Sequence, residues 1–410
     1  MQLDLDKSGR IQVNGAYTWM VDAARMGKSP IGKLVPISGV DPRSGRPYSH
    51  WAFLADPLPN ALPPFETSTW AAVIQAERAL ARLDQAAKQI PNPRLLRQPA
   101  LRREAQSTSA LEGTYAPFED VLGDDVGDRD SLSAEMREIL NYVVAAETGF
   151  DWVTERPLTA GFIGQLQQEL VRGTSGDHTD SGGPRDRQVC IGAPDSPIVD
   201  SRFVPAPPGD QLRAGFEAWV EWVNRPTEAS IVLRAAMAHY QFETLHPFSD
   251  GNGRIGRLLI ALQLIREGAL TEPLLVVSPW FEARRTAYQD GLLELSATGR
   301  WDPWVSFFAN GVQAGAEGTA HKIGALLEWA ATAEKRVRDG GTSGVAERLA
   351  GELIGGPIIT AKTVARRHQI SQQGAMNALR RLASLGLLRE GYRRNHITFF
   401  ADPVVEILAQ

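Results

Sequence analysis

The sequence lacks the features that mark secreted and membrane-spanning proteins. It has one cysteine, Cys190, so no disulfide can form within the chain, and we expect a cytoplasmic location. No run of about 20 apolar residues is present, so no membrane partner is expected. The first residues do not show the charged-then-apolar pattern of a signal peptide. Fixed-period repeats and long low-complexity tracts are also missing.

Charge of one sign does not dominate either. The 410 residues include 43 Lys and Arg against 48 Asp and Glu, a net charge of −5, so nothing indicates a nucleic-acid-binding protein overall. Hydrophobic residues make up 43% of the chain, which is ordinary for a globular protein. A chain of this length can form two or three domains with a well-buried core.

Apolar residues recur at helical spacing over most of the chain, which predicts a mainly α-helical fold. Helices are expected at 68–90, 94–111, 133–149, 159–172, 209–223, 229–244, 252–266, 281–296 and 302–336. The first 65 residues are rich in Pro, Gly and Ser, and we expect irregular structure or short strands there. Two short β-like runs on either side of the turn 193–197 predict a β-hairpin over about 183–206.

A run of twelve residues, H-P-F-S-D-G-N-G-R-I-G-R from His246 to Arg257, lies between two apolar helices. Its proline and its glycines should force a tight loop. Gly251 and Gly253 leave backbone N–H groups available to an anion, beside the positive end of the next helix. Arg254 and Arg257 are three residues apart on that helix and can clamp further phosphate oxygens.

Two side chains in this run can take part in phosphate chemistry. Asp250 would repel phosphates unless a cation lay between them, and Mg²⁺ held by one carboxylate plus phosphates fits. His246 is the group of the run that titrates near neutrality, so it is the candidate base for an attacking hydroxyl. Each residue alone fits a Gly-rich surface turn better, but the complete string favours a phosphoryl- or nucleotidyl-transfer site.

The run resembles the signature of the Fic family, H-P-F-x-D-G-N-G-R-x-x-R, at every fixed position. Fic proteins are mostly α-helical enzymes that typically transfer AMP from ATP to Ser, Thr or Tyr side chains, releasing pyrophosphate. The resemblance implies ATP as substrate, His246 as the base and Asp250 as the Mg²⁺ ligand. It also implies a nucleotide-binding group made of Gly251, Asn252, Gly253, Arg254 and Arg257. Kinase relatives depart from the signature at the Asp and Gly positions, which favours AMP transfer here.

A second run, T-S-A-L-E-G from Thr108 to Gly113, lies at the end of a predicted helix, with Gly113 as a C-cap. Thr108 and Glu112, four apart, share one face, and from the residues alone Glu112 is a solvated helix-end carboxylate. The run resembles the inhibitory Fic motif, Ser/Thr-x-x-x-Glu-Gly/Asn. That resemblance implies that Glu112 pairs with Arg257 in the place of the ATP γ-phosphate. The same carboxylate could position water for removal of AMP, a reverse activity of some members.

The resemblance also identifies the 183–206 hairpin as a flap that aligns the target protein by strand pairing, with Val189, Cys190 and Ile191 as docking residues. Cys190 stands where a larger residue, such as Trp, is expected. A small, half-buried apolar role is favoured for it over a redox role. His239, on the helix before the motif, is expected to be a hydrogen-bonded core residue.

The C-terminal residues 356–410 carry eight Lys and Arg against three Asp and Glu. A helix over 360–367, a second helix capped by Ser371 and a basic hairpin over 386–400 resemble a small winged helix-turn-helix. Winged helices also act as protein-interaction or dimerisation modules, so DNA contact stays one of two interpretations. Contact with DNA would use Gln372, Gln373 and Asn377 on bases and Arg393 and Arg394 on phosphates.

These patterns predict three parts: an N-terminal region with a helical bundle (1–92), an inhibitory helix with the Fic catalytic core (93–335), and a winged-helix domain (345–410). The expected activity is AMP transfer to a protein target, and to the chain itself, restrained by Glu112. The alternative is a DNA-binding regulator whose Fic core senses nucleotide. A sensor needs neither a general base nor a metal carboxylate, so the sequence favours the enzyme. A homodimer is common among similar proteins.

Overall fold

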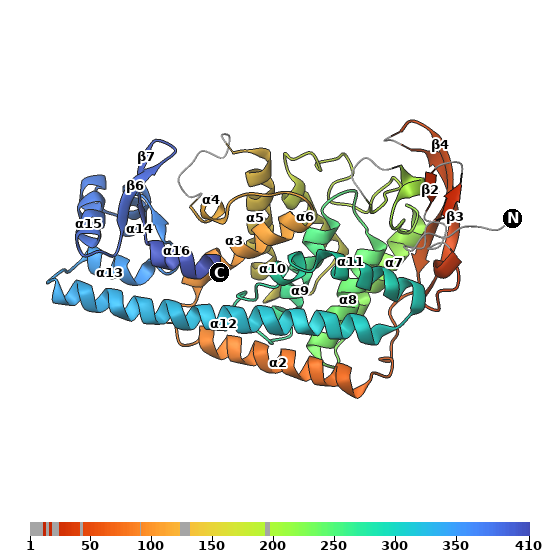
Figure 1. Ribbon diagram of the computed structural model, residues 1–410, viewed down its shortest axis with the longest axis horizontal. Helices are drawn as coiled ribbons and strands as arrows, with labels where there is room; N and C mark the ends of the chain where they lie inside the picture. The colour runs from red at the N-terminus through yellow and green to blue at the C-terminus, as the bar shows by residue number, and fades with distance from the viewer. Residues whose placement is uncertain are drawn as a thin grey trace. The chain divides into compact units, whose positions relative to one another are not determined.

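The computed structural model describes residues 11–13, 16–18, 24–41, 44–90, 92–123, 132–192 and 197–410, and it confirms the mainly helical fold (Figure 1). Within these ranges, no helix combines the length and apolar character that a bilayer crossing requires. The chain forms two compact units. The first holds Met1–Gln75, Asp151–Gln263 and Arg284–Asn310, and the second holds Ala76–Phe150, Leu264–Ala283 and Gly311–Gln410. The three-part division by sequence stays a prediction.

The core of the first unit is α8 (Ile231–Leu245), in which every residue after the first is buried. A helix that has no solvent-facing polar side belongs to a core rather than to a surface. The flanking helices α7 (Asp210–Asn224) and α11 (Arg285–Thr298) pack on it, and α6 (Ala160–Val171) packs on α7. Two buried indoles donate to its backbone, Trp219 to the Ala238 carbonyl (2.8 Å) and Trp304 to the Ala236 carbonyl (2.9 Å).

The first unit also holds an antiparallel hairpin of β3 (Gly32–Val40) and β4 (Pro47–Ala55), preceded by the short pair β1 (Ile11–Val13) and β2 (Ala16–Thr18). Strands of nine residues are longer than the short strands expected. At the turn, the Gly45 amide donates to the Asp41 carbonyl (2.8 Å), and Gly45 has a φ of 66°. Glycine adopts this left-handed conformation without strain. Gly45 therefore suits the turn of a long hairpin, in a region where irregular structure or short strands were predicted.

In the second unit, α3 (Arg94–Leu111) begins and ends where the sequence predicts. It packs against α4 (Phe118–Leu122) and α10 (Ser278–Glu282). The same unit holds most of α2 (Thr67–Ala87) and of α5 (Ala134–Val153). The buried Arg102 guanidinium donates to the Leu122 carbonyl (3.2 Å). The buried Glu104 carboxylate accepts from the Val277 amide (2.9 Å) and the Ser278 amide (3.0 Å), which caps α10. These three hydrogen bonds fix α3 within its unit.

The predicted helix over 281–296 is wrong in its continuity, because two helices occupy this stretch. The first, α10, ends at Glu282, and α11 begins at Arg285. Arg284 lies between them with φ −125° and ψ 31°, outside helical geometry. Neither Gly nor Pro stands at the break, so the sequence carries no local signal for it.

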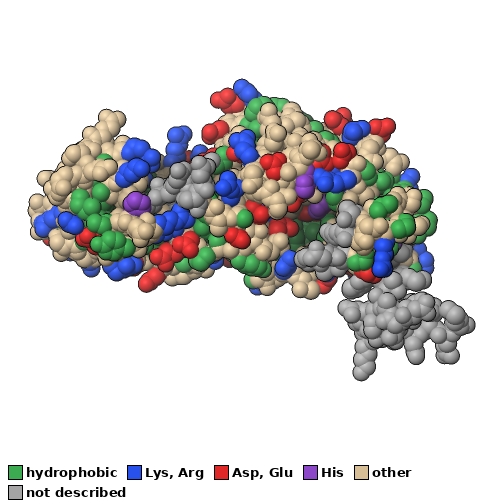
Figure 2. All heavy atoms as spheres, turned by 90° about the horizontal axis from the view of Figure 1, so that it is seen from above, with side chains coloured by type: hydrophobic (Ala, Val, Ile, Leu, Met, Phe, Trp, Pro, Cys, Tyr) green, Lys and Arg blue, Asp and Glu red, His purple; other side chains and the backbone are tan. Residues whose placement is uncertain are grey.

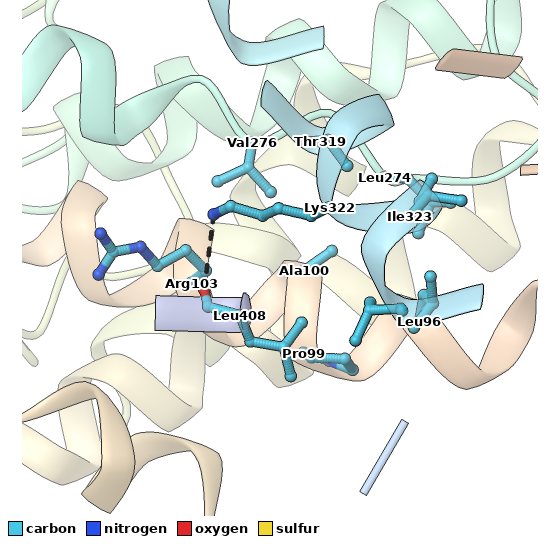
Figure 3. Close-up of a pocket in the computed structure, with 11 residues that line it drawn as sticks. Leu96, Pro99, Ala100, Arg103, Leu274, Val276, Thr319, Lys322, Ile323 and Leu408 are labelled. Carbon is cyan, nitrogen blue, oxygen red and sulfur yellow. Dashed lines mark hydrogen bonds between the residues drawn. The ribbon is translucent and has the colours of Figure 1, made fainter. Parts of the chain in front are cut away.

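A small pocket in the second unit lies between α3 and α12 (Trp301–Asp339), and Leu408 of the C-terminal helix α16 (Asp402–Ala409) also lines it (Figure 3). Apolar side chains line it, and Lys322 enters it from α12. The Lys322 ammonium donates to the Leu408 carbonyl at 3.5 Å. Burial, together with the nearby positive charge of Arg103, lowers the pKa of Lys322 to about 8. Lys322 therefore ties the end of the chain to α12.

The C-terminal residues follow the order helix, strand, helix, helix, hairpin. The elements are α13 (Val345–Glu352), β5 (Ile358–Ile359), α14 (Ala361–His368), α15 (Gln372–Ser384), β6 (Arg389–Arg393) and β7 (His396–Phe400). The sheet order is β5-β7-β6, all antiparallel. The predicted cap of α15 is present, since the Ser371 hydroxyl accepts from the Gly374 amide (3.1 Å). This order is the one that a winged helix-turn-helix requires, and that assignment stays a prediction.

The tip of this C-terminal hairpin contacts α4 of the same unit. Arg393 donates to the Asp120 carbonyl (2.7 Å) and contacts the Asp120 carboxylate (3.3 Å). Its side chain is only 10% exposed. The expectation that Arg393 faces a DNA phosphate is therefore wrong for this structure, because the guanidinium already has a protein partner.

Candidate active site

His246 ends α8 in the left-handed region, with a φ of 49°, and its amide donates to the Phe242 carbonyl (2.9 Å). A residue other than glycine in this region costs about 1–2 kcal/mol, and such strain gathers at functional sites. The Nδ1 atom of His246 lies 3.2 Å from the Glu243 carbonyl. Since a carbonyl can only accept, Nδ1 carries the hydrogen in the neutral ring, and Nε2 is the nitrogen able to take a proton.

The loop after His246 is clasped by Asn252, the first residue of α9 (Asn252–Arg266). Its side-chain oxygen accepts from the Phe248 amide (2.9 Å), and its side-chain nitrogen donates to the Phe248 carbonyl (2.8 Å). Phe248 is 1% exposed and packs edge-on against Phe216, which anchors the loop in the core. Both polar groups of the Asn252 side chain are thus used within the loop, so Asn252 would contact an anion through its backbone amide.

Gly251 has a φ of 80°, and a Cβ atom there would lie 2.8 Å from the Leu170 side chain. Both the conformation and the close packing require glycine. The first amides of α9 have no partner within the helix, so they form a ready anion site at its positive end. Beside them, Arg254 Nη2 contacts Asp250 Oδ1 at 3.0 Å. The Arg254 side chain is 5% exposed and that of Asp250 is 40% exposed, so the carboxylate is the accessible partner.

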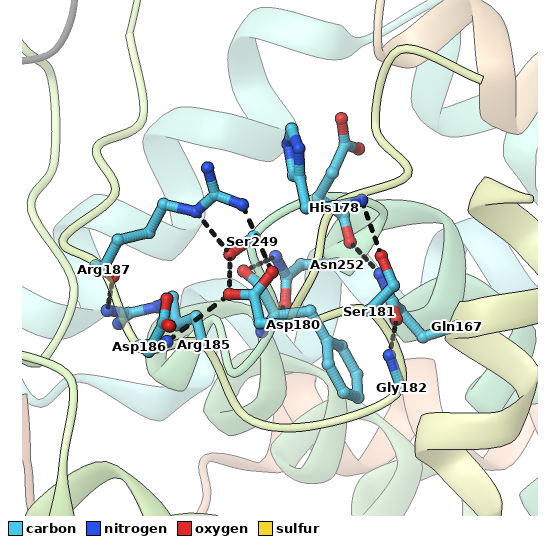
Figure 4. A network of polar contacts seen from close by, with 12 residues as sticks. Gln167, His178, Asp180, Ser181, Gly182, Arg185, Asp186, Arg187, Ser249 and Asn252 are labelled. Carbon is cyan, nitrogen blue, oxygen red and sulfur yellow. Dashed lines mark hydrogen bonds and ion pairs between the residues drawn. The ribbon is translucent and has the colours of Figure 1, made fainter. Parts of the chain in front are cut away.

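The carbonyl side of the loop is held from outside by α6 and the segment that follows it (Figure 4). The Gln167 side chain donates to the Asp250 carbonyl (3.1 Å) and accepts from the Gly182 amide (2.7 Å). A Cβ atom at Gly176 would lie 2.6 Å from Asp250 Oδ2, so the backbone there packs directly on the carboxylate. Loop carbonyls thus face protein donors, which leaves the amide side of the loop for a ligand.

Asp180, Arg187 and Ser249 form a second support that the sequence reasoning missed (Figure 4). The Ser249 hydroxyl donates to Asp180 Oδ2 (2.5 Å) and accepts from Arg187 Nε (3.0 Å), and Arg187 Nη2 contacts Asp180 Oδ1 (3.2 Å). Burial raises the pKa of Asp180, but its contacts with Ser249 and Arg187 outweigh burial and lower that pKa overall. The available signal was a pair of charged residues, Asp180 just before the predicted flap and Arg187 at its start.

Within the described residues of the flap, Ile191 and Phe203 form one antiparallel bridge and exchange both backbone hydrogen bonds (2.8 and 3.0 Å). Of the predicted turn 193–197, residues 193–196 lie outside the described residues. The returning limb also pairs with β4, since the Phe53 amide donates to the Val204 carbonyl (2.8 Å). Cys190 is half-buried and packs on a small cluster of flap and hairpin residues, Ala52, Ile198, Val204, Val35, Ile37 and Tyr48. The N-terminal hairpin, where irregular structure or short strands were predicted, therefore supports the flap.

The residues of the predicted inhibitory pair lie in different units. Thr108 is fully buried within α3, and Glu112, directly after α3, is exposed. Gly113 follows with a φ of 97°, the left-handed conformation expected of the predicted C-cap. Arg257, on α9 of the first unit, is 2% exposed. The Glu112–Arg257 contact stays a prediction.

His239 lies on α8 and serves the core. Its Nε2 lies 2.8 Å from the Tyr288 hydroxyl and its Nδ1 lies 3.2 Å from the Gly256 carbonyl, and the residue is 1% exposed. Burial, with the positive charge of Arg257, lowers the pKa of His239 to about 3. The ring is neutral at physiological pH and fully enclosed, so His246 is the histidine positioned for chemistry.

His239 should make the folded protein sensitive to acid. The unfolded chain protonates this ring near pH 6.5 and the folded chain only near pH 3, so lowering the pH through this window favours unfolding. The wild type should therefore lose about 2 kcal/mol more unfolding free energy between pH 7 and pH 5 than His239→Gln. Urea unfolding at both pH values measures this, with His321→Gln on the exposed face of α12 as control. Equal losses in wild type and His239→Gln would contradict it.

Two family profiles match this chain. Residues 70–151 match the one described as Fic/DOC family N-terminal, and residues 157–264 match the one described as Fic/DOC family. The first match contains the whole of α3 and the run from Thr108 to Gly113. The second contains α6, the flap, α8 and the loop from His246 to Arg257.

Curated relatives match over shorter stretches. A segment of 94 residues is 36% identical to a protein adenylyltransferase of Caenorhabditis elegans, covering 22% of this chain and 16% of that protein. Another of 140 residues is 34% identical to the protein adenylyltransferase Fic of Culex quinquefasciatus, covering 33% of this chain and 24% of that protein. This chain thus spans at most about a quarter of these two relatives.

One solved structure is similar over most of the chain. It is a Fic family protein from Desulfovibrio desulfuricans G20, with a TM-score of 0.55 and 20% identity. The match covers 83% of this chain and 98% of that one. At this level of identity, the likeness shows a shared fold.

Proposed function

With its two matches to Fic/DOC profiles, this chain belongs to the Fic/DOC family, and we propose that it transfers AMP from ATP to a hydroxyl group of a protein. The observation that carries the proposal is the loop between α8 and α9. A strained His246 and a half-exposed Asp250 stand beside the first amides of a helix that also presents Arg254. Base, carboxylate, anion-binding amides and guanidinium are the groups that nucleotidyl transfer needs.

In the proposed reaction, the hydroxyl oxygen of the target attacks the α-phosphorus of ATP. The bond between that phosphorus and the oxygen bridging to the β-phosphate breaks, and pyrophosphate leaves with the electron pair. His246 accepts the hydroxyl proton at Nε2. The amides at the start of α9, with Arg254, would hold the phosphates in line for the attack. Arg257 is proposed to bind the γ-phosphate.

The residues present fit Mg²⁺ that arrives with the nucleotide. Among the described residues, no three carboxylate, histidine or cysteine side chains gather into a metal site. One accessible carboxylate, Asp250, stands at the anion site, and Mg²⁺ is commonly held by one or two carboxylates plus phosphates. When bound, the ion would neutralise phosphate charge that Asp250 otherwise repels. When Mg²⁺ and phosphates bind, the 3.0 Å contact between Asp250 and Arg254 would break. Asp250 would then pair with the ion, and Arg254 would pair with a phosphate.

The flap is proposed to present the target's Ser, Thr or Tyr to His246. An extended segment pairing with the backbone of Val189, Cys190 and Ile191 would be read largely without regard to its sequence. The same geometry permits modification of the chain itself. A single cysteine cannot form a disulfide within the chain, so an oxidising compartment would give no advantage, and we propose that the transfer reaction occurs in the cytoplasm.

We also propose that Glu112 restrains this activity. A carboxylate paired with Arg257 would take the place of the γ-phosphate and so misplace the α-phosphate. Thr108, buried in α3 one turn earlier, would hold the end of the helix in position. The exposed position of Glu112 also suits a second proposed role, which is to orient water for removal of AMP.

The test is transfer from ATP carrying label on either the α- or the γ-phosphate. The proposal expects α-label on protein in Glu112→Gly, less in wild type and none in His246→Ala, with no γ-label in any of them. Protein carrying γ-label alone would show phosphate transfer and overturn the proposal. The proposal would also be overturned if neither label appeared on protein, even when the Glu112→Gly variant is supplied with candidate target proteins.

A DNA-binding regulator is the rival function, and the helix-turn-helix order of the C-terminal residues favours it. Gln372, Gln373 and Asn377 are exposed on α15 as that function requires. Against it, Arg393 is occupied by Asp120, and basic and acidic side chains are interspersed over the described residues of the face in Figure 2. A gel shift with duplex DNA, lost in Gln373→Ala, together with no labelling would support the regulator.

A further inference from the structure

Arg185 lies at the entrance of the flap and is 1% exposed, although it carries a charge. Its guanidinium donates to three backbone carbonyls. Nε donates to His246 (2.8 Å), Nη1 to Arg187 (3.0 Å) and Nη2 to Ala206 (2.5 Å). Its own amide donates to the Pro247 carbonyl (2.8 Å). One residue therefore makes four hydrogen bonds to three different stretches of backbone.

These carbonyls belong to the parts that must cooperate in the proposed reaction. His246 carries the base, Arg187 lies in the outgoing limb of the flap, and Ala206 follows the returning limb. The guanidinium is planar and presents its donors in a fixed fork, so three simultaneous bonds set both distance and direction. A flexible ammonium on Lys could not satisfy all three. Between the limbs, Gln188 adds a lateral bond to the Pro205 carbonyl (3.0 Å).

The burial of this charge is costly. Removal from water lowers the pKa of Arg185 to about 10, although the negative charge of Asp180 acts in the opposite direction. The three acceptors of the guanidinium are neutral carbonyls, which compensate a buried charge less well than a carboxylate does. The arrangement therefore favours geometry over stability.

We propose that Arg185 is a positioning residue for AMP transfer, which fixes the base of the flap to the backbone of His246. A target hydroxyl held by strand pairing on the flap then meets Nε2 at hydrogen-bond distance. This proposal rests on the proposed function. Without Arg185, the flap and the catalytic loop would each keep their own contacts, but the distance between hydroxyl and base would no longer be set.

The expected effect is selective. A misplacement of about 1 Å between reacting groups can lower a rate by roughly 10²-fold. Nucleotide binding should change little, because the amides of α9 and Arg254 do not contact Arg185 in any described bond. We therefore expect kcat for transfer to fall by roughly 10²-fold while the Kd for ATP stays nearly constant.

The experiment uses the full chain with Glu112→Gly as background, so that inhibition does not mask the rate. Arg185→Ala and Arg185→Lys are compared with Arg213→Ala, which removes an exposed arginine of α7. Transfer of α-label gives kcat, and ATP binding is titrated separately. Added guanidinium ion should restore part of the rate to Arg185→Ala, which loses the group, and none to Arg213→Ala.

Three outcomes would overturn the proposal. Transfer by both Arg185 variants at the background rate is the first. A loss of ATP binding as large as the loss of transfer is the second, because it shows general structural support. The third is a folded Arg185→Ala protein that guanidinium does not restore. If Arg185→Ala fails to fold, Arg185→Lys, which keeps charge and volume, provides the test through the same two measurements. Absence of transfer in Glu112→Gly itself would instead overturn the proposed function.

Discussion

Replacing His246 by Ala in the Glu112→Gly protein is expected to lower the rate of AMP transfer by roughly 10²- to 10⁴-fold, the usual contribution of a general base. Among the described residues of the loop, no other side chain can accept a proton near neutral pH. His239, the nearest histidine in sequence, is enclosed in the core with its pKa lowered to about 3. Initial rates of incorporation from α-labelled ATP measure the effect.

The same variant should still bind ATP, because the amides of α9, Asp250 and Arg254 remain. That separates loss of the base from collapse of the loop. His321→Ala, on the exposed face of α12, is the matched control and should transfer at the rate of its parent. A His246→Ala protein that binds ATP and transfers AMP at an unchanged rate would remove His246 from the mechanism.

Glu112→Gly alone is expected to raise modification of the chain by itself, by roughly 5- to 150-fold, the usual range of coupling between two sites. The reason is release of Arg257 for the γ-phosphate, which lets the α-phosphate settle in line with the hydroxyl. Glu112 lies just outside α3, where a change of side chain removes no helical hydrogen bond. The measurement is α-label incorporated per chain over time, at equal protein concentration.

A matched control is Glu119→Ala, which removes another exposed carboxylate from the same unit, on α4. It should leave self-modification unchanged, since Glu119 is not part of the inhibitory motif. Equal rates for wild type and Glu112→Gly would show that Glu112 does not restrain the site. Equal stimulation by both variants would point to charge on this surface rather than to a specific lock.

Much of the helical frame follows from local sequence. The bounds of α9, Asn252–Arg266, are those predicted, because a glycine-rich loop directly precedes an apolar run. The bounds of α3 are also those predicted, with Pro93 before its first residue and Gly113 just after Glu112. In both cases, the residues that start and stop the helix lie within one turn of its ends.

Other features depend on contacts between distant residues. The sequence does not indicate that Arg185 donates to the backbone of His246. Every residue has a backbone carbonyl, so the acceptor cannot be recognised from the residue type. The pairing of Phe53 with Val204 joins the flap to a region where only irregular structure or short strands were predicted, and only the folded chain shows this pairing. The charge of Arg393 favoured a contact with a DNA phosphate, whereas in the structure Arg393 forms an ion pair with Asp120 of the same chain. In each case, the outcome depends on a contact with a residue that is distant in sequence.

The cap that Glu104 gives to α10 bears on how the proposed inhibition could be relieved. Pulling α3 away would strip this buried carboxylate of two amide donors and expose two helices to water at once. Bending the chain beyond Leu111 breaks none of these hydrogen bonds, so it costs less free energy than unfolding the helix. We therefore expect the proposed displacement of Glu112 to involve the few residues after α3 rather than α3 itself.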